Sequence, residues 1–263
     1  PLLNQHPVAN LYLRDLIDRQ GIDYFGLHRW MGAFENDTLV ALNADIAAVN
    51  PKVPCKLSVP VGKPEACVAF GHFTANQGGT ERIMSLRDSS EAFWQGLGTP
   101  TPLINHPQHV MSIRNHSEGD TLAIRPATKS MLADLIESTA LMRLEDEGID
   151  PRKHDYDLWH QTIEVLIAQR RIWVATDQGQ LAFVIEIGTR CSKGTQIGST
   201  YVPPKFRGQG IATRGMRSIV NYLLQDTQFV SLLVNEGNTP ARKCYERVGF
   251  QYGPEYQLFG FTI

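Results

Sequence analysis

Four residues in the second half of the chain, Arg207-Gly208-Gln209-Gly210, combine two closely spaced glycines with a basic side chain. They lie in the stretch YVPPKFRGQGIATRG, between a strand-like run and a helix-like run. Because glycine destabilises regular elements, glycines at such a boundary indicate a backbone that turns sharply or closely approaches a ligand. Backbone amides at the start of a helix bind phosphate, so we expect a phosphate group here.

The charge around this turn differs from that of the whole chain, whose formal net charge is −2. No acidic residue occurs between Glu186 and Asp226. Such a run is often only a solvated surface, but its position around the glycine turn favours a polyanionic ligand. Its basic residues are Arg190, Lys193, Lys205, Arg207, Arg214 and Arg217.

Three phosphate-binding designs compete for the glycine turn. A P-loop needs Lys and Ser or Thr after the last glycine, where this chain has Ile211-Ala212. A dinucleotide fingerprint needs a third small residue where this chain has Thr213, and its acidic ribose partner is missing. The third design, a pyrophosphate held by successive amides at a helix N-terminus, needs no lysine and agrees with the residues.

Two signatures in the chain resemble those of one family. VPPKFRGQGIAT is similar to the Gln/Arg-x-x-Gly-x-Gly/Ala motif of the GNAT (GCN5-related) N-acetyltransferases, with Lys205 at the position of the usual Gln or Arg. FVSLLV followed by NEGNTPARKCYERVGF resembles the second signature, in which an Asn, an Ala, a Tyr and a final Gly-Phe recur. More weakly, the N-terminal part resembles the helper domain of two-domain bacterial members.

This resemblance implies acetyl-CoA as co-substrate and no metal. The backbone of Tyr201 and Val202 would pair with the pantetheine arm, and the amides from Arg207 to Ala212 would hold the pyrophosphate. Asn238 is a position from which the family often contacts the cofactor. The cofactor-binding residues that the resemblance implies are Tyr201, Val202, Arg207, Gly208, Gln209, Gly210, Ile211, Ala212, Asn235, Asn238, Ala241 and Tyr245.

Acetyl transfer to an amine needs a polarised thioester carbonyl, a proton for the departing thiolate and a base for the amine. A backbone N–H near Val202 would polarise the carbonyl. Tyr245 matches the family's tyrosine, and a phenol with a reference pKa of about 10 can protonate a thiolate of comparable basicity. Core packing on an apolar helix face is the alternative role of Tyr245.

The catalytic base is not fixed by the sequence, because QIGSTYV lacks the strand glutamate that many relatives carry. Glu186 on the preceding strand and Glu145 and Glu147 near the first helix connector are the candidates, and deprotonation through ordered water is the alternative. The connector 143–157 is rich in acidic residues. It would suit a cationic amine if it lines the acceptor site, and is otherwise a solvated loop.

From residue 121 onward, the hydrophobic pattern predicts the order β-α-α-β-β-β-α-β-α-β, a mixed α/β sheet flanked by helices. The expected helices cover 128–144, 157–170, 209–224 and the run from Thr239 to Gly249, and the expected strands include 121–128 and 229–234. The resemblance identifies this part as the GNAT acyl-CoA N-acyltransferase fold.

The N-terminal part has weaker signals, which indicate a smaller α/β domain and a decayed, GNAT-like copy of the second. We expect a helix over 8–21, a strand–turn–strand over 29–45 and a strand over 65–71. The segment 94–121, rich in Pro, Gly, Asn and His, reads as a connector. The predicted domains are residues 1–117, a helper domain, and 118–263, the acetyltransferase domain.

The composition, with 42% hydrophobic and 20% charged residues, is that of a globular protein and not of a basic nucleic-acid binder. No apolar run reaches the length of a membrane span, and the first residues lack the pattern of a signal peptide. Four cysteines without metal-ligand spacing indicate reduced thiols and a cytoplasmic location. His106, His109 and His116 read as surface residues.

The leading function is therefore an acetyl-CoA-dependent N-acetyltransferase that acts on a primary amine of a small molecule or peptide, as a monomer or homodimer. Direct attack of the amine in a ternary complex is the expected mechanism. A non-catalytic module that senses acyl-CoA and a transferase of a different acyl group are the alternatives.

Overall fold

The computed structural model describes residues 1–20, 28–46, 57–191 and 193–261. The chain divides into two compact units. The first unit contains Pro1–Val110, Leu233–Asn238 and Tyr252–Ile263, and the second contains Met111–Leu232 and Thr239–Gln251. Two short segments near the C-terminus thus group with the N-terminal half, and the domain boundary at 117/118 stays a prediction.

In the described part of the second unit, the strands follow the sheet order β10-β9-β8-β7-β6. The strands are β6 (Arg125–Pro126), β7 (Ile172–Asp177), β8 (Gln180–Arg190), β9 (Thr195–Tyr201) and β10 (Val230–Asn235), whose last residues belong to the first unit. The helices are η2 (Lys129–Met131), α4 (Leu132–Glu147), α5 (Pro151–His154), α6 (Tyr156–Ala168), η3 (Pro204–Phe206), α7 (Ile211–Leu223) and α8 (Thr239–Val248).

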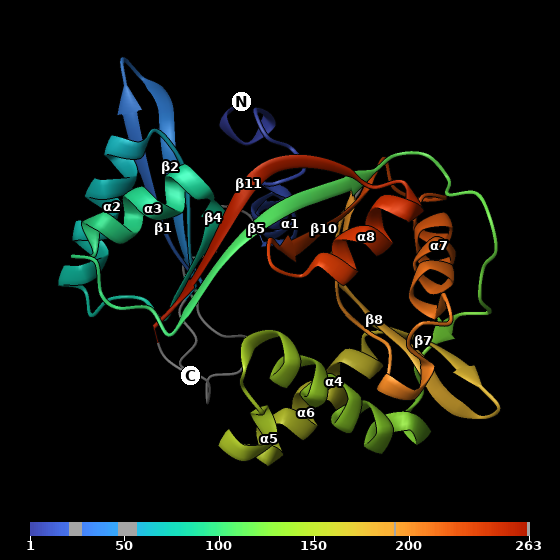
Figure 1. The fold of residues 1–263 in the computed structure, drawn as a ribbon. Helices are drawn as coiled ribbons and strands as arrows, with labels where there is room; N and C mark the ends of the chain where they lie inside the picture. The colour runs from blue at the N-terminus through green and yellow to red at the C-terminus, as the bar shows by residue number, and fades with distance from the viewer. Residues whose placement is uncertain (21–27, 47–56, 192, 262–263) are drawn as a thin grey trace. The chain divides into compact units, whose positions relative to one another are not determined.

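Both faces of this sheet are covered by helices, with α4 and α6 on one side of β7 and β8 and α7 on the other (Figure 1). Val184 of β8 belongs to the buried cluster shared with α4 and α6. Phe183, its neighbour in the strand, points the opposite way, so that a Cβ on Gly215 of α7 would lie 2.8 Å from its ring. Alternation along β8 therefore explains why its apolar run is almost continuous.

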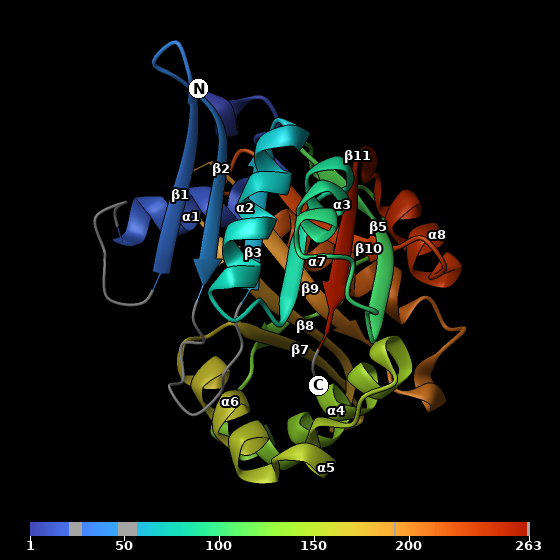
Figure 2. The same ribbon diagram turned by 90° about the vertical axis from the view of Figure 1, so that its left-hand side faces the viewer.

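Among the described residues of the first unit, the strands follow the order β1-β2-β3-β4-β11-β5. They are β1 (His28–Glu35), β2 (Thr38–Ile46), β3 (Leu57–Gly62), β4 (Arg82–Leu86), β5 (Ile104–Ile113, which ends in the second unit) and β11 (Gln251–Gly260). The helices are η1 (Leu2–Asn4), α1 (Leu11–Gln20), α2 (Pro64–Asn76) and α3 (Arg87–Gly96). Helices α2 and α3 lie in front of the strands and α1 behind them (Figure 2).

The two halves of the chain repeat one element order. A helix, a hairpin, a third strand, a helix, a strand, a helix and a strand run from α1 to β5 and again from α4 to β11, with α5 and α6 added. In each copy the third and fourth strands are parallel, as the pairs Leu57–Arg82 and Thr195–Val230 show. This agrees with the decayed copy expected from the sequence. The last strand, β11, pairs antiparallel with β4 of the first unit.

Most of the expected elements are confirmed, including the helices over 128–144, 157–170 and 209–224 and the hairpin over 29–45. Residue 21, at the end of the helix expected over 8–21, lies outside the described residues. The expected strand over 65–71 is wrong. It forms helix α2, because Pro64 occupies the first turn and Cys67, Phe70 and Thr74 are buried at helical spacing.

Two further expectations are corrected by the structure. The segment 94–121 is not all connector, because it contains the whole of β5, whose polar and proline residues conceal its strand pattern. The strand expected over 121–128 is reduced to the two residues of β6. None of the helices in the described ranges is long and apolar enough to cross a membrane.

Helices α2 and α3 pack unusually closely through two glycines, which gives a test of this fold. A Cβ on Gly96 would lie 2.1 Å from the carbonyl oxygen of Val68. The backbone cannot yield cheaply, so Gly96→Ala should lower the free energy of unfolding by about 1–3 kcal/mol, as overpacked cores do. Urea unfolding measures this loss, with the exposed neighbour Gln95→Ala as control. Equal stabilities of the two variants would contradict the packing.

Candidate active site

The glycine turn has the backbone conformation that its sequence indicates. Gly208 and Gly210 have φ angles of +76° and +73°, in the left-handed region that favours glycine. A Cβ at either position would meet no atom within 4 Å, so the turn faces open space. Gly210 is the N-cap of α7 and no side chain caps this end of the helix. The amides of the first turn of α7 therefore lack intrahelical acceptors and can bind an anion.

The approach to the turn is fixed by its own backbone. Within η3, the amide of Phe206 donates to Pro203 O at 2.9 Å and the amide of Arg207 to Pro204 O at 3.1 Å. The buried Phe206 side chain anchors this segment. The Gln209 side chain adds a further bond across the turn, because its Nε2 donates to Lys205 O at 3.1 Å. These hydrogen bonds hold the backbone of the turn in this conformation.

Strand β9, which leads into the turn, carries a bulge near its end. Val184 of β8 pairs with Tyr201 and Glu186 pairs with Gly198, so two steps along β8 correspond to three along β9. Ser199 takes a φ of +49° at the bulge. On its other edge, β9 pairs with β10 at Thr195 and Gln196. The bulge redirects backbone amides of β9, and such groups can pair with an extended ligand.

Tyr245 lies on α8 and is almost fully buried. Its hydroxyl shares a hydrogen bond with the side chain of Thr200, next to the bulge, and its ring centroid lies 5.9 Å from that of Phe250. Burial raises the pKa of Tyr245 to about 12, and the bond to Thr200 only partly offsets this. The phenol is therefore protonated at neutral pH, as a proton donor must be.

The three carboxylates that the sequence offers as catalytic bases are all in ion pairs. Glu186 accepts from Arg171 Nη2 at 2.8 Å and from Ser199 Oγ at 3.1 Å. Glu147 is paired with Arg143 at 3.1 Å, one turn earlier in α4. These contacts occupy oxygens of both carboxylates.

Glu145, the third of these carboxylates, contacts the glycine turn directly. Arg207 Nη2 lies 3.0 and 2.8 Å from its two oxygens, and Tyr201 Oη donates to it at 3.4 Å. Burial, followed by the negative charge of Glu145, raises the pKa of Tyr201. The end of α4 is thereby joined to the end of β9 and to the turn.

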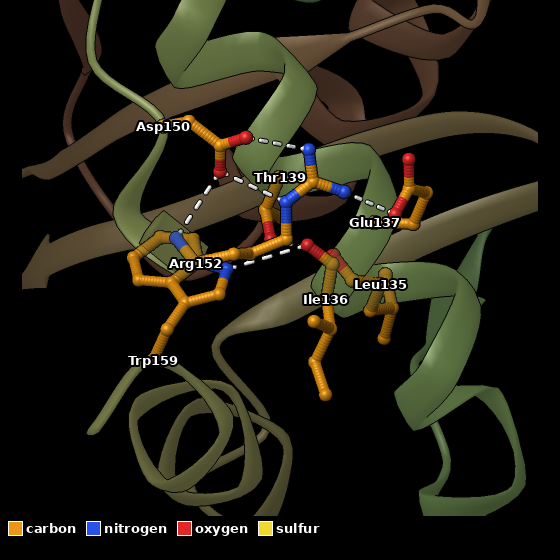
Figure 3. A network of polar contacts seen from close by, with 7 residues as sticks. All are labelled: Leu135, Ile136, Glu137, Thr139, Asp150, Arg152 and Trp159. Carbon is orange, nitrogen blue, oxygen red and sulfur yellow. Dashed lines mark hydrogen bonds and ion pairs between the residues drawn. The ribbon is translucent and has the colours of Figure 1, made fainter. Parts of the chain in front are cut away.

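Within the connector between α4 and α6, Asp150 is paired with Arg152 (Figure 3). Asp150 accepts from Arg152 Nε at 2.9 Å and Nη2 at 2.8 Å, and Arg152 also pairs with Glu137. The hydrogen bond from Arg152 holds the pKa of Asp150 below its usual value. Trp159 Nε1 donates to Ile136 O at 3.3 Å and fixes α6 to α4. Asp150 therefore holds the connector together and is not free to bind an amine.

The implied residues of the second signature fall in both units. Asn235 and Asn238 belong to the first unit, where Asn235 Oδ1 accepts from Gln108 Nε2 at 2.8 Å and the amide of Asn238 donates to Asn235 O at 2.9 Å. Ala241 and Tyr245 lie on α8 in the second unit. The roles of these residues toward a cofactor stay predictions.

Three residues of the site were not predicted from the sequence to be site residues. Thr200 meets the Tyr245 hydroxyl, and Ser199 forms the bulge and bonds Glu186. Arg214 was counted only among the basic residues, yet it stands in the first turn of the uncapped helix α7. Its position after the glycine turn was a usable signal, whereas nothing in the sequence marks a bulge at Ser199.

Comparison with known proteins defines the class. Residues 135–250, which include the glycine turn, β9 and Tyr245, match the family model described as the acetyltransferase (GNAT) family. This part of the chain is thus similar to the GNAT acetyltransferase family. A search of curated proteins finds no match.

Solved structures share the fold over almost the entire chain. A GCN5-related N-acetyltransferase from Kribbella flavida is 10% identical with a TM-score of 0.62, covering 98% of this chain and 95% of its own. One from Sphaerobacter thermophilus is 17% identical with a TM-score of 0.56, covering 96% and 89%. A tandem GNAT protein from the clavulanic acid biosynthesis pathway is 11% identical with a TM-score of 0.51, covering 98% and 94%.

The burial of Tyr245 predicts a stability loss in alkali. Its pKa is about 12 in the folded state and about 10 when exposed, so stability is full below pH 10 and falls as the unfolded chain ionises first. At about pH 11 the Tyr245 contribution is about 1 kcal/mol below its neutral value. Urea unfolding at both pH values should show a smaller alkaline loss for Tyr245→Phe than for wild type. Equal alkaline losses of stability in the two proteins would contradict the raised pKa of Tyr245.

Proposed function

We propose that this protein is an acetyl-CoA-dependent N-acetyltransferase that acts on a primary amine of a small molecule or peptide. The observation that carries the proposal is the uncapped start of α7 behind two left-handed glycines. In the bound state, amides from Gly208 to Ala212 hold the diphosphate, and the positive end of the helix dipole adds to the attraction. The amide of Arg207 is not among them, because it already donates to Pro204 O. Arg214 supplies a cation in the same turn.

The pantetheine arm and thioester extend from there along the end of β9. Backbone groups of Tyr201 and Val202 pair with the arm as a neighbouring strand would. The carbonyl of Val202 already accepts from Arg207 Nε at 2.9 Å, which orients that peptide group. An amide beside the bulge at Ser199 donates to the thioester oxygen and stabilises its negative charge in the transition state.

The chemical step follows from these positions. The neutral amine attacks the thioester carbonyl carbon, a C–N bond forms, and the C–S bond breaks. Tyr245 gives its proton to the thiolate and is later reprotonated from solvent. The amine loses its proton through ordered water, because Glu186, Glu145 and Glu147 are each held by an arginine.

The two copies of the fold have different roles in this proposal. Residues 118–263 carry the transfer site and 1–117 form a helper domain. In the first copy, only Lys63 joins β3 to α2, Pro64 lacks an amide hydrogen and Glu65 places a negative charge in the first turn. These features oppose phosphate binding, so each chain binds one CoA. The free thiols of Cys67, Cys191 and Cys244 suit the reducing cytoplasm.

A non-catalytic acyl-CoA sensor is the second candidate, favoured by the ion pairing of the three nominated bases. The two functions differ in turnover. Release of free thiol from acetyl-CoA, measured with a panel of primary amines, identifies the enzyme. Tight binding of acetyl-CoA without any amine-dependent thiol release would identify the sensor.

Gly210 provides the sharpest test of the phosphate site. Gly210→Ala places a side chain on a left-handed residue, and relief of this strain would turn the helix amides away from the bound diphosphate. The affinity for CoA should therefore fall by at least about tenfold, or about 1.4 kcal/mol. Gly179→Ala is the matched control, since Gly179 has a φ of +78° and equally open surroundings in the β7–β8 turn. Calorimetry should show unchanged affinity for the control. Equal affinities of the two variants would refute the site.

Tyr245 is tested by turnover. Because the hydroxyl is the proton donor to the thiolate, Tyr245→Phe should lower kcat by about 10²-fold or more. The affinity for acetyl-CoA should stay unchanged, since the ring keeps its place against Phe250. Steady-state thiol release and calorimetry measure the two quantities. An unaltered kcat would remove Tyr245 from the mechanism.

A further inference from the structure

The side chain of Arg207 contacts residues of both β9 and α4 and the segment that follows β9. Its Nε donates to Val202 O at 2.9 Å, and its Nη2 lies 2.8 Å from Glu145 Oε2. The guanidinium carbon lies 5.4 Å from the centroid of the Tyr201 ring. A cation at the first position of the glycine turn is thus turned toward α4 and paired with a carboxylate.

This pair is exposed to solvent, with 45% of the Arg207 side chain and 47% of the Glu145 side chain accessible. Exposed ion pairs contribute little to stability because water and salt screen them. A diphosphate carries more negative charge than one carboxylate and offers several acceptor oxygens. Arginine binds such groups through two parallel hydrogen bonds. Exchange of Glu145 for a phosphate on Arg207 is therefore favourable.

We propose that Glu145 is a placeholder for phosphate on Arg207, which the diphosphate of CoA displaces. This inference rests on the proposed function, and it adds a role for the Arg207 side chain to that of the turn amides. Once displaced, Glu145 and the Tyr201 hydroxyl lose their link to the turn. Cofactor binding thereby uncovers a carboxylate at the end of α4, beside the strand along which the thioester lies.

The test is a double-mutant cycle on CoA affinity, measured by calorimetry on the full chain. Glu145→Gln removes the competing charge and should tighten CoA binding by about two- to fivefold, the range of one exposed ion pair. Arg207→Gln should weaken binding. In the Arg207→Gln background, Glu145→Gln should have no effect. Glu147→Gln is the control, because it lies on the same helix but pairs with Arg143.

Each outcome of the cycle is decisive. Unaltered or weaker binding by Glu145→Gln, beside normal binding by wild type, would overturn the placeholder role alone. The placeholder role would also be overturned if Glu145→Gln tightens CoA binding in the Arg207→Gln background, or if Glu147→Gln tightens it equally. Either result would show a general charge effect. A wild-type protein that binds no CoA would instead refute the proposed function. Thermal melts of the variants confirm that each is folded.

Discussion

The start of α7 must present its amide hydrogens to solvent without a side chain to cap them, and the rest of the site depends on this constraint. The left-handed backbone at Gly208 and Gly210 satisfies this constraint, since glycine takes this conformation without strain. Segment η3 leads into the turn and is anchored by the buried side chain of Phe206. Gly215 has no side chain, so α7 can pack closely against Phe183 of the sheet. The bulge at Ser199 lies in β9, the strand that leads into this turn.

The internal repeat contains two copies of one topology that differ in their connectors. Both halves have the same element order and the same parallel pair of central strands. In the first copy, however, Ser89 Oγ donates to Gly62 O at 3.4 Å, and Ser85 Oγ bonds Pro60 O, so side chains of that copy occupy the carbonyls that end β3. We therefore propose that the shared topology provides a scaffold and that the connector after the third strand determines whether an anion can bind.

The sequence predicted the second half of the fold well because its signals are local. The paired glycines of the turn and the apolar period of α7 each act within a few residues. It failed at α2 and β5, where burial and strand pairing with distant segments override weak local patterns. The partners of Glu145 and Glu186 could not be predicted, since ion pairs such as Arg207–Glu145 join residues far apart in the chain.

The central claim is that the amides at the start of α7 anchor a coenzyme A thioester. Calorimetric titration of the 263-residue chain with CoA tests this most directly. We predict saturable binding with a stoichiometry of one CoA per chain, weakened by added salt because phosphates are being neutralised. Absence of binding by folded protein would contradict the central claim, and two equivalent sites per chain would contradict the assignment of the first copy as unable to bind phosphate.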